Sequence, residues 1–469
     1  MFDPRAVNSL VSFTNSQGVE ARGTLLKLTR TALIFEVYNP YSIVQLSEVL
    51  QDVQIRRGDR LIYRGRAVVS NLVNTGLMLI VSAILLDSWS DLAMVLADGE
   101  ALGEEVQQFL AEWDGAYRLR PGYQLSVSRL RSLMTETFRW LGQIDLSPES
   151  AAERQANELD DERFQELAEP ILERLGSLFA DFEGEAAEVP PEEVANHKRF
   201  AQHDLHPLML SAPFVHRSFY KPLGYAGDYE MVNMMLREPR EGPTTYAQLI
   251  NTLYLSAGPA VAHRNRIKIL LETLHEAAAR AASRGETVSV LNVGCGPAVE
   301  LQRFFGGDPL AERCDFELMD FNAETIAYTE RRLQASIADG NRPNRVRMVH
   351  QSVHELLKRA VRRDPGELSA HYDLVYCAGL FDYLSDRVCA RLLKLFYRWV
   401  KPGGKVLATN VHPSNPIRFA MEHIAEWYLI YRDEQQMSSL VPEVEAKRVW
   451  ADTSGVNIFL EMTKPAWKS

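Results

Sequence analysis

The sequence predicts an α/β protein in which an open sheet of alternating strands and helices follows a helical region and a small N-terminal β-barrel. Three observations lead to this prediction. From residue 286 onward, short apolar strands alternate with helical segments, and the first strand ends in a glycine turn. The middle of the chain carries apolar residues at helical spacing, and its start holds β-branched segments separated by turn residues. The predicted units are a barrel at 1–97, a helical region at 98–200, a helical lid at 201–285 and a sheet domain at 286–469.

Composition and charge exclude several classes of protein. At 469 residues the chain should hold two or three domains, and its net charge of -11 argues against a nucleic-acid partner, which would need a basic surface. The four cysteines form no C-x-x-C pair, so we expect reduced thiols and no bound metal. The N-terminus lacks the pattern of a signal peptide, and the apolar run 77–86 is too short to span a bilayer. We therefore expect a cytoplasmic protein with a buried strand at 77–86.

The β-rich start contains the run GTLLKLTRTALIFEVYNP, which resembles the central strands of a PilZ-type barrel. That family binds cyclic di-GMP through an R-x-x-x-R arm and a D/N-x-S-x-x-G strand. Neither motif is intact: residues 27–32 occupy the place of the second, with Ala32 where glycine is expected. The resemblance favours a degenerate barrel with a structural or regulatory role over a working nucleotide site.

The helical region contains no motif that indicates a chemical activity. Helices of this kind serve packing, dimerisation or enclosure of a substrate, which is compatible with a homodimer. The polar stretch 147–161 is predicted as a loop or the exposed start of a helix. The acidic stretch 183–193, with two prolines, is predicted as a linker.

The stretch KPLGYAGDYE, residues 221–230, places two glycines among hydrogen-bonding and aromatic side chains. Such loops often cap ligands, although a rigid turn whose aromatic side chains fill the core would have the same sequence pattern. Further along, Gly258-Pro259 should interrupt the helical stretch 243–285. Of the basic cluster HRNR that follows, Arg264 is our candidate for contacting a ligand carboxylate; a surface ion pair is the alternative.

The chemistry is concentrated where the strands end. After the strand VSVLNV and its glycine turn come a helix and a second strand ending in Asp320, 26 positions after Gly294. An acid there can accept hydrogen bonds from both ribose hydroxyls of an adenosine. A third strand, RVRMVHQS, a fourth stretch, YDLVYCAGLFDYL, and a fifth strand, KVLATNVHP, follow with helices between them. This order is typical of an open sheet that binds its ligand at the carboxyl edge.

Residues 286–412 resemble a class I, Rossmann-like, S-adenosylmethionine-dependent methyltransferase. The first motif is VLNVGCGP, the acidic second strand is FELMDFN, and WVKPGGKVLATN matches the turn and fifth strand. The family commonly has an acid where Asn292 stands, so a role of that side chain in holding the cofactor is in doubt. The resemblance implies a methionine site at the glycine turn, ribose at Asp320, adenine beside Phe321, and a channel near the methyl after the fourth strand. We count Arg264 as a cofactor-binding candidate too. The cofactor-binding residues that the resemblance implies are Asn292, Gly294, Cys295, Gly296, Asp320, Phe321, Gln351, Ser352, Val353, Cys377, Ala378 and Gly379.

Residues 201–469 are similar to bacterial proteins that make the quorum signal 3-hydroxypalmitic acid methyl ester. The similarity lies in KPLGYAGDYEMVN, HRNR, GLFDYLSD and PIRFAMEHIAEWYLIYR. It implies methyl transfer to the carboxylate of a long-chain 3-hydroxy fatty acid, a small-molecule partner whose chain is compatible with peripheral membrane contact.

A carboxylate is ionised near neutral pH, so this reaction needs positioning and no dedicated base. The candidates for positioning the acceptor are Tyr225, Asp228, Asp382 and Tyr383. The apolar stretch 419–431 would cover an acyl chain or form a helix packed on the sheet.

Three alternatives stay open. With a hydroxyl or amine acceptor, Asp228, Tyr225 or His412 would remove a proton. The chain would otherwise be a regulator that binds the cofactor while its barrel senses a nucleotide, or would methylate a protein partner.

Overall fold

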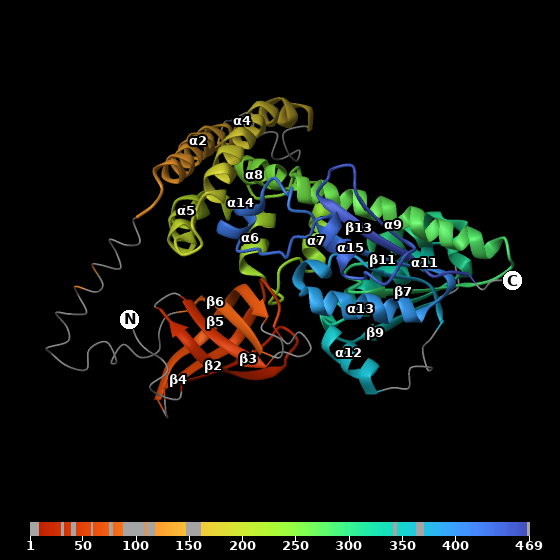
Figure 1. The fold of residues 1–469 in the computed structure, drawn as a ribbon. Helices are drawn as coiled ribbons and strands as arrows, with labels where there is room; N and C mark the ends of the chain where they lie inside the picture. The colour runs from red at the N-terminus through yellow and green to blue at the C-terminus, as the bar shows by residue number, and fades with distance from the viewer. Residues whose placement is uncertain are drawn as a thin grey trace.

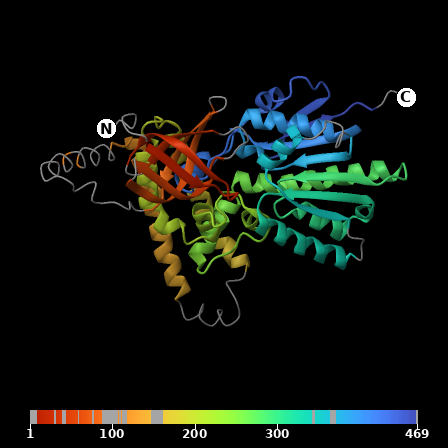
Figure 2. The same ribbon diagram turned by 90° about the horizontal axis from the view of Figure 1, so that it is seen from below.

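A computed structural model shows how these elements are arranged (Figures 1 and 2). The predictions for 98–117 and 147–160 lie outside the described residues, apart from the helical positions 107 and 110. The structure describes residues 9–29, 32–38, 44–57, 60–74, 78–87, 107, 110, 118–146, 161–340, 345–362 and 370–466.

The N-terminal strands form a closed antiparallel barrel in the order β1-β2-β3-β6-β5-β4, as predicted. Alternate side chains point inward, which is clearest in β6, where every second residue is buried. Residues 78–85 of the apolar run are therefore a barrel strand. The strands are β1 (Ser9–Thr14), β2 (Glu20–Leu28), β3 (Ala32–Tyr38), β4 (Val49–Arg57), β5 (Arg60–Asn74) and β6 (Met78–Leu85).

Among the described residues, six helices follow and pack around one apolar core. They are α2 (Pro121–Asp145), α4 (Asp161–Ala187), α5 (Val194–Met209), α6 (Pro213–Tyr220), α7 (Tyr229–Leu236) and α8 (Thr245–Leu255). The linker prediction at 183–193 is wrong for its first half, because α4 continues to Ala187. Glu183 lies inside this helix and accepts the backbone N–H groups of Phe419 and Ala420, at 2.8 and 2.7 Å. This acid thus joins α4 to a segment near the other end of the chain.

The C-terminal half forms a seven-stranded sheet in the order β12-β13-β11-β10-β7-β8-β9. The five strands from β7 to β11 are parallel, and β13 is antiparallel to β11. The strands are β7 (Val288–Val293), β8 (Cys314–Asp320), β9 (Val346–His350), β10 (Tyr372–Cys377), β11 (Val400–Val411), β12 (Lys447–Ala451) and β13 (Asn457–Thr463). The predicted fold class is confirmed.

Helices cover both faces of the sheet (Figure 2). One face packs on α9, α10 and α11, and the other on α12, α13 and α15. The break at Gly258-Pro259 is also confirmed, since α8 ends at Leu255 and α9 begins at Gly258. The helices are α9 (Gly258–Ala282), α10 (Val299–Gly307), α11 (Ala323–Asp339), α12 (Val353–Arg362), α13 (Asp386–Trp399), α14 (Arg418–His423) and α15 (Glu434–Ser439).

Two predicted elements end earlier than their apolar pattern indicated. The fourth strand stops at Cys377, and the short 3-10 helix η4 (Phe381–Tyr383) follows it. The stretch 419–431 is not one helix, because α14 ends at His423 and the chain then runs without regular secondary structure. No helix among the described residues is long and apolar enough to cross a membrane.

Candidate active site

A cavity opens at the carboxyl edge of the sheet and is closed by elements from the rest of the chain. Its sheet half includes lining residues at or just after the ends of β7, β8 and β10, with residues of α9 and α10. Its lid half includes lining residues from α6, α7, α8, the 221–230 loop, the stretch 417–425 around α14, the segment 427–432 and the barrel segment 44–48. The apolar side chains of the lid half include Leu46, Phe214, Val215, Met421, Ala425, Trp427 and Leu429.

The glycine turn forms the floor of the sheet half. Gly294 and Gly296 have φ angles of 72° and 52°, in the left-handed region that glycine adopts without strain. The N–H groups of Gly294 and Cys295 donate to Met319 O at the end of β8, at 2.8 and 3.0 Å. The turn is thus bound to the next strand and leaves its backbone facing the cavity.

Asp320 is a buried acid at the end of β8. Its carboxylate accepts hydrogen bonds from Gly296 N at 3.1 Å and from Asn322 N at 3.0 Å. Burial raises its pKa, and these backbone N–H groups act against the rise. The ring of the next residue, Phe321, lies 4.9 Å from the ring of Tyr225, centre to centre. An acid and an aromatic pair therefore stand side by side in the cavity wall.

Asn292 belongs to a buried polar group around Glu300, in the first turn of α10. Glu300 Oε1 accepts hydrogen bonds from Asn292 Nδ2 at 3.2 Å and from Tyr376 OH at 2.8 Å. Burial raises the pKa of Glu300. The amide of Asn292 can donate to Glu300, whereas an ionised acid at its place could not.

Arg266 of α9 lines the same cavity and is 5 % exposed. Its Nη2 lies 2.6 Å from His263 Nε2, which must accept because a guanidinium can only donate. Its Nε is buried and has no hydrogen-bond partner among the described residues. A Cβ on Gly379 would lie 2.8 Å from Nη1, so glycine there makes room for the guanidinium. Arg266 and Glu300 thus place a buried positive and a buried negative charge in one cavity.

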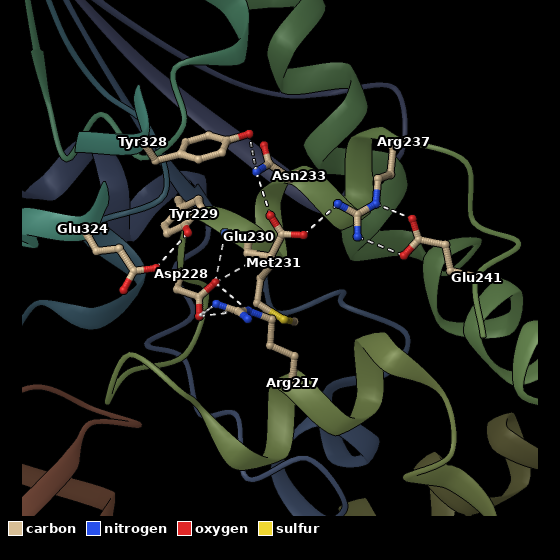
Figure 3. Close-up of polar contacts among 10 residues, drawn as sticks. All are labelled: Arg217, Asp228, Tyr229, Glu230, Met231, Asn233, Arg237, Glu241, Glu324 and Tyr328. Atoms are coloured by element: carbon tan, nitrogen blue, oxygen red, sulfur yellow. Dashed lines mark hydrogen bonds and ion pairs between the residues drawn. The ribbon is translucent and has the colours of Figure 1, made fainter. Parts of the chain in front are cut away.

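The 221–230 loop is held by the network that Figure 3 shows. Asp228 caps the N-terminus of α7 by accepting Glu230 N and Met231 N, both at 3.0 Å. Its carboxylate also pairs with Arg217, whose Nη2 lies 2.9 Å from Oδ2. Tyr229 OH donates to Glu324 Oε1 of α11 at 2.8 Å. The loop is therefore bound to α6, α7 and α11.

Asp382 and Tyr383 lie where the two halves meet. Asp382 Oδ1 accepts Val411 N at 2.6 Å, and burial raises the pKa of this acid to about 6. Tyr383 OH accepts Trp427 Nε1 at 3.0 Å. Burial, with the charge of Asp382, raises the pKa of Tyr383, and burial likewise raises that of Tyr225. Both phenols keep their protons near neutral pH and can donate hydrogen bonds.

The cavity collects most of the residues that the sequence singled out. Of the catalytic candidates, Tyr225, Asp382 and Tyr383 line it. Of the cofactor-binding candidates, the lining residues are Asn292, Gly294, Cys295, Gly296, Asp320, Phe321, Ala378 and Gly379.

The other candidates are not among its described lining residues: Asp228, Arg264, Gln351, Ser352, Val353 and Cys377. Arg264 instead donates to Met235 O at 2.9 Å and Leu255 O at 3.0 Å, so it ties helix ends together. Its neighbour Arg266 is the arginine that faces the cavity. Cys377 is fully buried in the core between the sheet and its helices.

The sequence indicated the cluster that holds Arg266 but favoured Arg264 within it, and it did not indicate Glu300 or two barrel residues, Gln45 and Leu46, which line the cavity as well. The acid in the first turn of α10 was a detectable signal, because it follows the glycine turn directly. No local pattern marks the barrel residues.

Several buried polar atoms in the cavity wall have no partner among the described residues: Ser218 Oγ, Tyr254 OH, Arg266 Nε and Asn457 Oδ1. Such atoms are costly unless a ligand or water satisfies them. The sheet half fits S-adenosylmethionine chemically. An acid suits ribose hydroxyls, aromatic rings suit adenine, and the charges of Arg266 and Glu300 suit the carboxylate and ammonium of its methionine end.

Comparison with known proteins agrees with this geometry. Residues 290–404 match the family model of the methyltransferase domain. No curated protein matches the sequence. Similar solved structures include a possible exported protein from Bordetella parapertussis, with 18 % identity and a TM-score of 0.40 over 54 % of this chain and 86 % of that chain.

Two further similar structures contain S-adenosylhomocysteine. Magnesium protoporphyrin IX methyltransferase from Synechocystis PCC 6803 has 12 % identity and a TM-score of 0.35, over 53 % of this chain and 98 % of that chain. The N-methyltransferase NodS from Bradyrhizobium japonicum WM9 has 14 % identity and a TM-score of 0.31, over 50 % of this chain and 98 % of that chain. The family match, together with the strand order of the sheet, identifies residues 290–404 as a methyltransferase domain.

Proposed function

We propose that this methyltransferase transfers the methyl group to the carboxylate of a small acid with an apolar chain, a 3-hydroxy fatty acid or a close analogue. The observation that carries the proposal is the composition of the lid half. Most of its wall is apolar, and its polar groups include the hydroxyls of Tyr383, Tyr254 and Ser218. Burial raises the pKa of Tyr254 as it does that of Tyr383, so both stay donors. Donors in an apolar wall suit an ionised carboxylate, which can only accept.

For the cofactor, we propose that Asp320 binds the ribose and that Phe321 and Tyr225 flank the adenine. Arg266 would bind the methionine carboxylate and Glu300 the ammonium. When bound, S-adenosylmethionine supplies a methyl group on a positively charged sulfur. Asp228 then acts as a positioning residue, because its carboxylate holds the start of α7 and the 221–230 loop.

Transfer to a carboxylate needs no base. One carboxylate oxygen forms a bond to the methyl carbon as the carbon–sulfur bond breaks, and the electron pair stays on sulfur. No proton is released. The work of the chain is to hold the acid in line and to keep water out, and Tyr383 can donate to the second carboxylate oxygen.

The experiment is to incubate the protein with methyl-labelled S-adenosylmethionine and a series of fatty and 3-hydroxy fatty acids. We expect saturable formation of the methyl esters, lost in the Asp320→Ala variant. Label in protein, or no labelled acid from the series, would contradict the proposal.

The raised pKa of Asp382 favours a second candidate, in which this acid removes a proton from a hydroxyl or amine acceptor. The Asp382→Asn variant distinguishes the two. Loss of a base lowers kcat by about 100-fold or more and removes a rise in rate near pH 6. An acid acceptor predicts a much smaller loss, because the amide keeps the acceptor for Val411 N.

A further inference from the structure

The barrel contributes directly to the wall of the cavity. Gln45 and Leu46 belong to the segment 44–48, which directly precedes β4, and each is 8 % exposed. They line the same cavity as Gly294 and Asp320 of the sheet edge. Figures 1 and 2 both show the barrel against the helices that precede the sheet. The lid half is therefore incomplete without the N-terminal barrel.

The segment 44–48 is fixed in place. Glu48 is 1 % exposed, and its carboxylate accepts Gln45 N at 2.8 Å, Ser16 N at 2.8 Å and Ser16 Oγ at 2.5 Å. Ser47 N donates to Val69 O at 2.9 Å, and Val69 N donates to Glu48 O at 2.9 Å. Ser47 has a φ of 60°, a strained conformation that persists only when its surroundings hold it. The position of Leu46 is thus determined by the barrel.

Two hydrogen-bonded contacts join this segment to other parts of the lid half. Val49 N donates to Gly224 O of the 221–230 loop at 2.6 Å. Ser47 Oγ donates to Tyr428 O at 2.9 Å and also accepts Tyr428 N. The barrel therefore supports both the loop that carries Tyr225 and the segment that carries Trp427.

The segment 427–432 lies between the barrel core and the cavity. Its side chains alternate, because Trp427 and Leu429 line the cavity while Tyr428 and Ile430 pack in the barrel core. Ile430 N also donates to Asp382 O at 2.7 Å. One extended segment thus contacts the barrel on one side and the reaction site on the other.

We propose that the barrel is part of the methyl-acceptor site and that Leu46 limits the length of the apolar chain that the site accepts. This inference rests on the proposed acid acceptor. Leu46 belongs to a fixed apolar wall, as do Trp427 and Leu429, whereas the sheet half holds the polar cofactor groups. A change at Leu46 should alter acceptor selection and leave cofactor affinity unchanged.

The test compares Leu46→Ala and Leu46→Trp with the control Leu50→Ala. Leu50 is a fully buried leucine of the same barrel core but is not among the described residues that line the cavity. The readouts are the ratio of kcat/KM for 3-hydroxyhexadecanoic and 3-hydroxydecanoic acids, and the Kd of S-adenosylhomocysteine. We expect Leu46→Ala to shift the ratio about tenfold toward the longer acid and Leu46→Trp to shift it toward the shorter one. An unchanged ratio, or one that shifts equally in Leu50→Ala, would overturn the inference.

A second measurement separates this inference from the proposed function. If the wild-type protein methylates neither acid, the proposed function fails. The contribution of Leu46 to the apolar site is then tested by binding of the fluorescent probe anilinonaphthalene sulfonate to protein loaded with S-adenosylhomocysteine. We expect Leu46→Trp to weaken probe binding about tenfold or more and Leu50→Ala to leave it unchanged. Equal binding by all variants, or no binding by the wild-type protein, would contradict a lid half that includes Leu46.

Discussion

The two halves of the cavity are built in different ways. The sheet half comes from short stretches that follow β7, β8 and β10, and backbone hydrogen bonds join Gly294 and Cys295 to the end of β8. The lid half comes from elements scattered over the chain, from Leu46 in the barrel to Leu429 near the other end. The difference indicates that one half is shaped by local strand geometry and the other by tertiary packing. Cofactor binding and acceptor selection should therefore respond to different substitutions.

The largest effect should come from the sheet half. Asp320→Ala removes the acid proposed to bind two ribose hydroxyls, so we expect the Kd of S-adenosylhomocysteine to rise about 100-fold or more. The matched control is Asp315→Ala, which removes an exposed acid from the same strand. Titration calorimetry measures both. A similar Kd in the two variants would refute the ribose assignment.

Charge alone can be tested at Glu300. Glu300→Gln keeps an oxygen for Asn292 and Tyr376 but removes the negative charge, so we expect S-adenosylhomocysteine to bind about tenfold more weakly. Methylthioadenosine lacks the amino-acid end and serves as the matched ligand, with an expected Kd equal to that of the wild-type protein. If both ligands weaken together, Glu300 supports the fold of the site and does not contact the ammonium.

The lid half can be disturbed at Gly227. Its φ is 71°, and a Cβ there would lie 2.6 Å from Tyr383 OH. Gly227→Ala should therefore displace Tyr383 and lower kcat/KM for the acid about tenfold, with an unchanged Kd for S-adenosylhomocysteine. Gly224→Ala is the control, since that glycine also has a positive φ but its Cβ would meet nothing closer than 3.5 Å. Equal loss in both variants would assign the effect to loop strain alone.

The smallest effect concerns stability outside the two halves. His423 lies in the helical core, with Nδ1 3.0 Å from Tyr123 OH, and burial, aided by Lys198 and His197, lowers its pKa to about 3. The folded protein keeps this histidine neutral, while the unfolded chain protonates it below about pH 6.5. As the pH is lowered from about 6.5 to about 3, the free energy of unfolding should therefore decrease by about 1.4 kcal/mol per pH unit.

His423→Asn removes this titration. The difference in unfolding free energy between the wild-type protein and the variant should change with that slope in denaturant titrations from pH 6 to pH 4. A parallel pH dependence of the two proteins would show that His423 is protonated when folded.

The sequence predicted the fold and the sheet half because their signals are local. Gly294, Gly296 and Asp320 each follow an apolar strand at a recognisable spacing. The barrel part of the lid half carries no such signal, since Leu46 lines the cavity only after the barrel packs on the rest of the chain. For the stretch 419–431, only the alternative of a single helix is wrong. Its side chains are buried on both sides, so the alternation of an extended segment is hidden in a run of apolar residues.

Asp228 and Arg264 show the same limit for polar residues. Both stand in motifs that favour ligand contact, yet Asp228 caps a helix and Arg264 binds carbonyl oxygens at helix ends. Which of two nearby arginines faces a cavity depends on the rotation of α9 against the sheet, and a single sequence does not determine that rotation.

The central claim is that a carboxylate receives the methyl group. The most direct measurement uses 3-hydroxyhexadecanoic acid, which carries a carboxylate and a hydroxyl on one molecule, with carbon-13 methyl-labelled S-adenosylmethionine and nuclear magnetic resonance of the product. We expect the labelled carbon to appear as a methyl ester. A labelled methyl ether at the 3-hydroxyl group would contradict it and assign proton removal to Asp382.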